Sequence, residues 1–168
     1  LMTGNDGVKR VDGNDGWKRD AVIVDCDGTL VDVSSVRHHV LVGAGKKKDF
    51  DAFHSESINC PPHQNIVDLV NALSGQHDIF VVTARRQKWW WHTKIWLEEN
   101  DVSHHYLLMR GDDDHRRDYE VKLDILALIR KTHNVILAID DNPAVIQLWV
   151  DQGIETLVVP GWIEEPKG

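Results

Sequence analysis

Short apolar runs alternate along this chain with segments in which apolar residues recur at helical spacing. The apolar runs predict strands over residues 21–24, 79–82, 106–109, 135–139 and 154–159. The helical spacing predicts helices over residues 65–73, from after Arg86 to about Asn100, from 119 to about 133, and over 143–152. This alternation is typical of an α/β fold, so we expect a three-layer, Rossmann-like arrangement around a parallel central sheet.

The length of the chain limits this fold to one domain with a short insertion. With 168 residues, 42% of them hydrophobic, the chain can bury one core but not two. We expect one domain over residues 20–168, in which the mixed segment 31–62 forms a flap or small cap insertion. Residues 1–19 are polar and glycine-rich, and we expect them to be a flexible lead.

Two carboxylates, Asp25 and Asp27, directly follow the first predicted strand. Side chains two residues apart in an extended backbone point the same way, so both carboxylates can converge on one spot. Charges this close repel unless a cation lies between them, and Mg²⁺ is the hard divalent ion that fits oxygen ligands. Gly28 allows a sharp turn whose amides can cradle a phosphate. On these residues alone, a polar turn without a metal is the alternative.

A second acidic pair, Asp140 and Asp141, follows the strand predicted over residues 135–139. The carboxyl ends of neighbouring parallel strands meet at one edge of the sheet, where open α/β sheets bind ligands. Helix capping explains one such residue, but not Asp140, Asp141 and Asn142 together. We therefore expect the two aspartates to complete an oxygen cage for Mg²⁺.

Three further side chains could hold a phosphate at the same edge. Thr83 ends the second predicted strand, where its hydroxyl can donate to a phosphate oxygen, and Arg85 can add a bidentate fork. Lys122 begins the helix predicted from residue 119 and could place its ammonium on a transferring phosphoryl group.

In their order along the chain, these motifs resemble those of the haloacid dehalogenase superfamily of phosphohydrolases. The resemblance rests on the turn 25–29, Thr83, Lys122, Asp140 and Asp141. It implies that Asp25 attacks phosphorus to form an aspartyl phosphate, while Asp27 acts as general acid and then as base. It also implies that Mg²⁺ is held by the Asp25 carboxylate, the Asp27 main-chain carbonyl and Asp140, with Asp141 helping directly or through water. Thr83 and Lys122 would grip the phosphoryl oxygens.

A closer resemblance is to the phosphatase half of phage-type polynucleotide kinase/phosphatases, which removes 3′-phosphates from nucleic acid ends or nucleotides. It rests on residues 88–98, 108–110, 121–122, 138–141 and 145–149. The resemblance implies that Arg37, Arg85 and Arg110 bind phosphate or substrate, beside Gly28 and Thr29.

The chain departs from that family in two respects. It carries Thr83-Ala84-Arg85 where Ser-Gly-Arg is expected. It also has no kinase P-loop, because Gly45-Lys46 lacks both the earlier glycine and the following Ser or Thr. The protein would then be a phosphatase without its kinase partner, or with a kinase domain on another chain.

Composition limits which ligands the protein can bind and indicates where in the cell it is expected. The net charge of −8 argues against a protein that coats long stretches of nucleic acid, but it allows a terminal phosphate as ligand. Cys26 and Cys60 make a poor disulfide framework, and we expect Cys26 to be a small core side chain. No apolar run reaches the roughly 18 residues of a membrane span, so we expect no membrane contact and a cytoplasmic protein.

The remaining aromatic and basic residues are expected to be structural or solvated. Trp91, Ile95 and Trp96 are predicted to pack on the sheet. The alternatives for an exposed tryptophan are stacking on a base and burial in a dimer contact. The ten histidines lack the spacing of a structural zinc site, and we expect most at the surface. Lys46-Lys47-Lys48 is expected to be a solvated loop, with attraction of phosphate as the alternative.

The sequence thus predicts a Mg²⁺-dependent phosphomonoester hydrolase that acts on a 3′-phosphorylated nucleotide or nucleic acid end. One alternative is a phosphatase of 5′-nucleotides or other small metabolites. Another is a non-catalytic module that binds phosphorylated ligands. Asp27 speaks against the last alternative, because simple binding does not require it.

Overall fold

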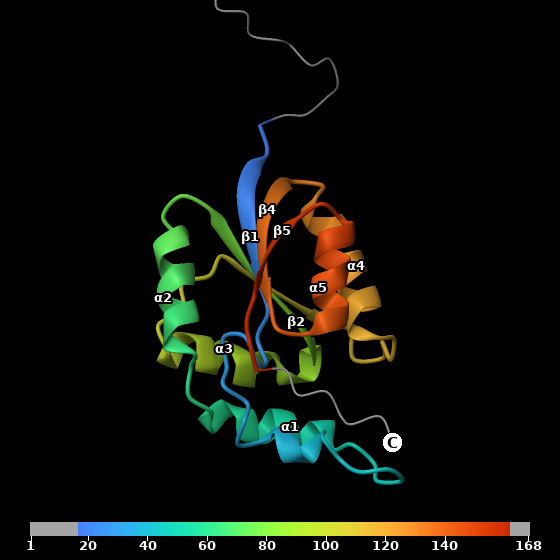
Figure 1. The fold of residues 1–168 in the computed structure, drawn as a ribbon. Helices are drawn as coiled ribbons and strands as arrows, with labels where there is room; N and C mark the ends of the chain where they lie inside the picture. The colour runs from blue at the N-terminus through green and yellow to red at the C-terminus, as the bar shows by residue number, and fades with distance from the viewer. Residues whose placement is uncertain (1–16, 162–168) are drawn as a thin grey trace, which may run out of the picture.

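The computed structural model describes residues 17–161, which are built around one parallel sheet (Figure 1). Its strands are β1 (Arg19–Val24), β2 (Asp78–Arg86), β3 (Tyr106–Arg110), β4 (His133–Asp140) and β5 (Glu155–Val158). The strand order is β3-β2-β1-β4-β5, and all neighbouring pairs are parallel. The predicted α/β fold is therefore confirmed, and the turn after β1 leaves the middle of the sheet.

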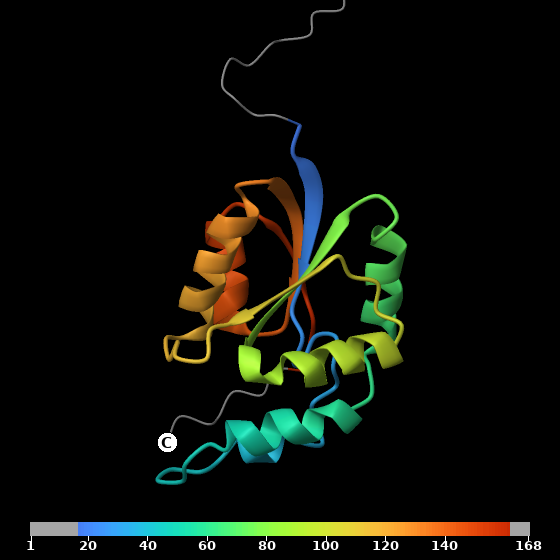
Figure 2. The same ribbon diagram turned by 180° about the vertical axis from the view of Figure 1, so that it is seen from behind.

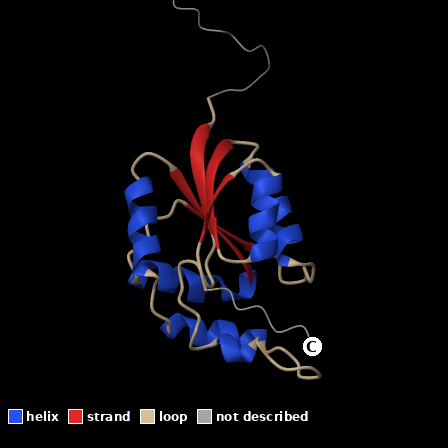
Figure 3. Cartoon of the chain, in the orientation of Figure 1, coloured by secondary structure: helices blue, strands red, loops and turns tan. Residues whose placement is uncertain are grey.

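Helices cover both faces of this sheet, as Figures 2 and 3 show. They are α2 (Gln64–Leu73), α3 (Trp90–Glu99), α4 (Asp118–Ile129) and α5 (Pro143–Asp151). Alternate residues of β1 face opposite cores: Val22 and Val24 pack with α2 and α3, whereas Ala21 and Ile23 pack with α4 and α5. Burial on both faces explains why this strand is apolar from Ala21 to Val24.

The inserted segment lies beyond the carboxyl ends of the strands (Figure 1). It contains α1 (Phe50–Glu56) and two 3₁₀ turns, η1 (Arg37–His39) and η2 (Ser57–Asn59). Five of its buried apolar side chains join the same core cluster as α2 and α3: Val31, Val33, Val36, Phe53 and Cys60. This packing holds the inserted segment over the edge of the sheet that carries the candidate site residues.

Several element boundaries differ from the prediction, and β2, predicted over residues 79–82, runs from Asp78 to Arg86. The helix predicted to reach about residue 133 ends at Ile129, and β4 already begins at His133. His133 pairs with Arg19 in the β1–β4 ladder, and its Nε2 lies 2.8 Å from Oδ2 of Asp78. Pairing with β1 therefore places His133 in a strand, although helical periodicity had assigned this residue to the helix. After Arg86, the 3₁₀ turn η3 (Gln87–Trp89) precedes α3.

The predicted packing face of α3 was wrong for two of its three residues. Trp91 is 69% exposed and Ile95 is 39% exposed, whereas Trp96 is buried. The buried stripe consists of Thr93, Trp96 and Leu97, which is set by how the helix lies on its neighbours. The indole Nε1 of Trp96 donates to the carbonyl of Cys60 at 2.8 Å, so α3 also holds the end of the inserted segment.

Other expectations concern cysteines, membrane contact and the termini. Cys26 and Cys60 are both buried and unpaired with each other, which confirms Cys26 as a core side chain. No helix within residues 17–161 is long and apolar enough to cross a membrane. The predicted flexible lead falls mostly on residues 1–16, which lie outside the described residues, as do residues 162–168.

Candidate active site

The turn after β1 forms the centre of the site. The amide of Asp25 donates to the carbonyl of Ile139 at 2.9 Å, which continues the pairing with β4 past the end of the strand. Gly28 has φ +83°, and a Cβ added there would lie 2.1 Å from Oδ2 of Asp141. This turn therefore requires glycine for its backbone conformation and also for the close approach of Asp141.

Three buried carboxylates meet beside this turn. One oxygen from each of Asp25, Asp140 and Asp141 lies within 4.8 Å of the others. The ammonium of Lys122 donates to Oδ1 of Asp25 at 2.7 Å and to Oδ2 of Asp140 at 2.9 Å. Three carboxylates and one ammonium leave a formal charge of −3 + 1 = −2. This residual charge and the all-oxygen donor set fit a hard divalent cation such as Mg²⁺.

The protonation of the cluster reflects this excess of negative charge. Burial raises the pKa of Asp25 well above its usual value, against the attraction of Lys122, and the charges of Asp140 and Asp141 raise it further. Burial, with the charge of Asp140, raises the pKa of Asp141 to about 6. Both carboxyls would be ionised more readily with a cation among them, which agrees with a metal site.

The backbone and a tryptophan hold Asp140 in place. Its Oδ1 accepts from the amides of Asp141 at 3.0 Å and Asn142 at 3.1 Å. Its Oδ2 accepts from the indole of Trp149 at 3.2 Å. The N-cap of α5 is Asn142, whose side chain accepts from the amide of Ala144. Capping therefore accounts for Asn142, while Asp140 and Asp141 belong to the carboxylate cluster.

Asp27 is engaged by Arg85. The guanidinium donates to both carboxylate oxygens of Asp27, from Nε at 2.9 Å and from Nη2 at 2.5 Å. Burial would raise the pKa of Asp27, but the charge and hydrogen bonds of Arg85 outweigh it and hold that pKa below its usual value. Arg85 also donates to Ser57 and Thr93, so it joins Asp27 to the inserted segment and to α3. Its role as a phosphate ligand stays a prediction.

Two threonines place hydroxyl groups beside the carboxylates. Thr29 Oγ1 lies 3.1 Å from Oδ2 of Asp25 and 3.3 Å from Oδ1 of Asp141, so it can donate to either. Thr83 is buried within β2, three residues before the strand ends at Arg86, and lines the cavity. Its Oγ1 accepts from the amide of Arg85 at 3.2 Å. That bond uses a lone pair of Thr83 and leaves its hydroxyl proton for a ligand.

The other two predicted arginines also line the cavity but already have partners. Arg37 lies 3.8 Å from Asp141 and donates to the carbonyl of Gly161 at 2.9 Å. Arg110 donates to the carbonyls of Ala84, Asp114 and Arg116 and to the carboxylate of Asp118, so it anchors the loop between β3 and α4. Whether either arginine binds substrate stays a prediction.

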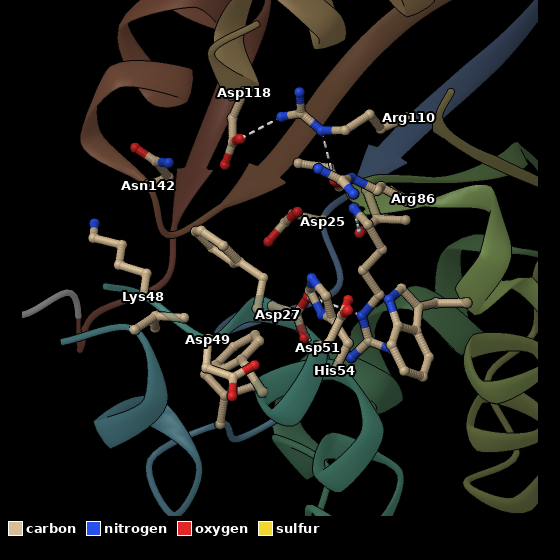
Figure 4. Close-up of a pocket in the computed structure, with 18 of the residues that line it drawn as sticks. Asp25, Asp27, Lys48, Asp49, Asp51, His54, Arg86, Arg110, Asp118 and Asn142 are labelled. Carbon is tan, nitrogen blue, oxygen red and sulfur yellow. Dashed lines mark hydrogen bonds and ion pairs between the residues drawn. The ribbon is translucent and has the colours of Figure 1, made fainter. Parts of the chain in front are cut away.

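The site opens into a cavity of about 900 Å³ between the sheet edge and the inserted segment (Figure 4). Its wall includes Phe50, His54 and Trp89, which sequence reasoning did not assign to the site. His54 Nδ1 lies 3.8 Å from Oδ2 of Asp27, and burial lowers the pKa of this histidine to about 4, so the ring is neutral at pH 7. The sequence could have identified His54 only if residues 50–56 had been interpreted as a helix that faces this edge of the sheet.

Comparison with known proteins points to one family. The model of the polynucleotide kinase PNKP phosphatase domain matches residues 19–161. A protein of Autographa californica nuclear polyhedrosis virus, described as a bifunctional polynucleotide kinase/RNA ligase, is 29% identical over 141 residues. The match covers 82% of this chain but only 19% of that viral protein, so the chain spans about a fifth of its relative.

Solved structures share the fold at low sequence identity. One chain of a Pnkp1/Rnl/Hen1 RNA repair complex aligns with a TM-score of 0.69 and 21% identity, covering 84% of this chain and 42% of that one. The class C acid phosphatase of Bacillus anthracis aligns with a TM-score of 0.65 and 18% identity, covering 87% and 68% of the two chains. A haloacid dehalogenase-like hydrolase of Streptococcus pneumoniae aligns with a TM-score of 0.61 and 15% identity, covering 82% and 83%.

Proposed function

Because this chain belongs to the family of polynucleotide kinase PNKP phosphatase domains, we propose that it removes 3′-phosphates from nucleic acid ends or nucleotides through an aspartyl phosphate. The observation that carries the proposal is the position of Asp25. Its carboxylate faces the cavity, held by Lys122 and Thr29, with Asp140 and Asp141 beside it and Asp27 two residues along the chain.

In the first step, a carboxylate oxygen of Asp25 attacks phosphorus and the ester bond to the leaving oxygen breaks. Protonated Asp27 gives its proton to that oxygen, which departs as an alcohol. Lys122 and Thr83 hold the phosphoryl oxygens and orient phosphorus toward Asp25. Mg²⁺, held by Asp25, the main-chain carbonyl of Asp27, Asp140 and Asp141, would supply positive charge to offset that of the carboxylates and the phosphate.

In the second step, water attacks the phosphorus of the aspartyl phosphate and passes a proton to Asp27. Inorganic phosphate leaves, Asp25 is regenerated as a carboxylate, and Asp27 is again protonated. Arg85 lowers the pKa of Asp27, so the ionised form, which is the base of this step, is favoured in the free chain. The protonated form that acts as acid in the first step is the less populated one.

The nucleophile is tested by Asp25→Asn, which keeps the size of the side chain but removes its charge. We expect kcat to fall by about 10⁴-fold, since the reaction depends on this group. Asp68→Asn, on the exposed face of α2, is the matched control and should retain full activity. Circular dichroism checks that both variants fold, and turnover comparable to the wild type in Asp25→Asn would exclude the proposed nucleophile.

The substrate is tested with a panel of 3′-phosphorylated oligonucleotides, 3′- and 5′-mononucleotides and sugar phosphates, each with and without Mg²⁺. The proposal requires the highest kcat/KM with 3′-phosphorylated nucleotides or oligonucleotides. Preference for a 5′-nucleotide or a sugar phosphate would instead favour a metabolite phosphatase. No Mg²⁺-dependent hydrolysis of an aryl phosphate would favour a non-catalytic binding module.

We further propose that this phosphatase acts together with a polynucleotide kinase. The viral relative is described as a single protein with kinase and ligase activities, and the chain covers only 19% of it. The kinase would be a domain on another chain or elsewhere in a longer polypeptide.

A further inference from the structure

The cavity is close to neutral although the chain is acidic overall. Eight lysines and arginines and seven aspartates line it, in a chain with a net charge of −8. The basic residues deepest in the cavity are bound to carboxylates or backbone carbonyls, as Lys122 and Arg110 illustrate. Lys47 and Lys48 differ, because they lie in the exposed loop before α1 and have no hydrogen bond or ion pair within residues 17–161.

The acidic residues next to these lysines have other partners. Asp49 is the N-cap of α1, and its carboxylate accepts from the amide of Ala52 at 2.9 Å. Asp51 forms an ion pair with Lys88 at 2.7 Å. The charges of Lys47 and Lys48 are therefore left for a ligand that enters the cavity.

An aromatic wall begins beside the two lysines. Phe50, the first residue of α1, is 54% exposed and lines the cavity. Its ring lies 6.3 Å from that of His54, and the His54 ring lies 6.1 Å from that of Trp89. Within the described residues, His54 Nδ1 and Trp89 Nε1 are buried without hydrogen-bond partners. Buried polar atoms without partners cost free energy, and a half-exposed aromatic ring gains little from burial, so this wall points to a ligand.

We propose that Lys47, Lys48 and Phe50 form a binding element for single-stranded nucleic acid, with Phe50 stacked on a base and the lysines on a phosphodiester of the same strand. This proposal rests on the proposed function, which places the terminal phosphate at Asp25. Exposed aromatic rings next to basic groups are how proteins bind single strands without reading their sequence. A free 3′-nucleotide has only the phosphate that goes to Asp25 and none for the lysines. The preferred substrate is therefore the end of a strand.

The lysine triplet supplies its own control, because Lys46 is exposed in the same loop but does not line the cavity. If the loop were merely solvated, substitution of any of the three lysines would have the same effect on activity. For the aromatic ring, the control is Trp91, which is 69% exposed on α3 and does not line the cavity.

The test compares kcat/KM for a short 3′-phosphorylated oligonucleotide, as DNA and as RNA, with kcat/KM for a 3′-mononucleotide. We expect the ratio of the two to fall about tenfold in Lys47→Ala/Lys48→Ala and at least about fivefold in Phe50→Ala. The ratio should stay within about twofold of wild type in Lys46→Ala and Trp91→Ala. The dependence of log kcat/KM on log salt should also become shallower in the double lysine variant.

An equal effect of Lys46→Ala and the double variant, or an equal loss on oligonucleotide and mononucleotide, would overturn the proposal. If the wild type hydrolyses neither substrate, the proposed function fails but this inference is still decided by binding. Fluorescence anisotropy with a labelled 3′-phosphorylated oligonucleotide would then have to show weaker binding in Lys47→Ala/Lys48→Ala than in Lys46→Ala. Equal affinities would exclude the element, and circular dichroism establishes that each variant is folded.

Discussion

At the scale of single residues, Gly28 is needed both for the backbone conformation of the turn and for the position of Asp141 in the carboxylate cluster. Its positive φ is unfavourable for other residues, and Asp141 occupies the space that a Cβ would need. We expect Gly28→Ala to lower the free energy of unfolding by about 1–3 kcal/mol and to weaken Mg²⁺ binding, because Asp141 must move. Urea unfolding and a Mg²⁺ titration measure the two effects.

Gly75→Ala is the matched control for this substitution. A Cβ at Gly75 would meet no described atom within 4 Å, and its φ is not in the left-handed region. The control should change the unfolding free energy by less than about 0.5 kcal/mol. Similar losses in both variants would contradict a requirement for glycine at position 28.

For Arg85, the sequence predicted a phosphate-binding role but not the side chains that it contacts. Its position after a strand predicted a phosphate fork, and the resemblance gave the same role. The structure places its guanidinium against Asp27, Ser57 and Thr93, which lie 58, 28 and 8 residues away in the chain, while the phosphate role stays a prediction. Contacts over such separations depend on how the segments pack, so no local pattern could predict them.

At the scale of elements, the helix α3 and the inserted segment are held together by Trp96. Its buried indole donates to the carbonyl of Cys60, near the end of that segment. We expect Trp96→Phe to lower the free energy of unfolding by about 1–3 kcal/mol, because the carbonyl loses its partner and a small cavity opens. Urea unfolding measures this loss.

The exposed Trp91 on the same helix provides the comparison. Trp91→Phe should change stability by less than about 0.5 kcal/mol, since 69% of this residue is exposed. If instead Trp91→Phe were the more damaging substitution, the orientation of α3 described here would be wrong.

Elements were easiest to predict where a single pattern controlled them. The strand β1 is apolar along its buried part because both of its faces are covered, and that run is visible in the sequence. The end of α4 was missed because β4 extends back to His133 to pair with β1. The face of α3 was missed because tryptophans occur on several sides of this helix, and only packing selects Trp96.

At the scale of the whole molecule, the buried carboxylates couple stability to pH and to Mg²⁺. The pKa of Asp141 is raised to about 6 in the folded chain, and that of Asp25 is raised as well. A raised pKa means that the folded chain binds the proton more tightly than the unfolded chain does. The stabilisation is complete below about pH 4 and is lost as the pH rises through about 6.

Mg²⁺ should reverse this trend, because it needs ionised ligands. At one fixed concentration, about a hundred times its Kd at pH 7.5, we expect it to raise Tm by several degrees near pH 7.5 and by clearly less near pH 5, where its Kd is higher. Thermal unfolding with and without Mg²⁺ at both values of pH measures the difference. Asp141→Asn should reduce the effect of Mg²⁺, and equal shifts at both pH values would contradict a site built on these carboxylates.

The sequence by itself determined the alternation of strands and helices, the family resemblance and the acidic residues that end β1 and β4. These features follow from local periodicity and from chemistry placed at strand ends, which neighbouring residues encode. Only the tertiary structure decided that Arg85 binds Asp27, that Asp141 lies against Gly28, and that Phe50 and His54 line the cavity. Each of these contacts joins segments that folding brings together, and its geometry depends on how whole elements pack.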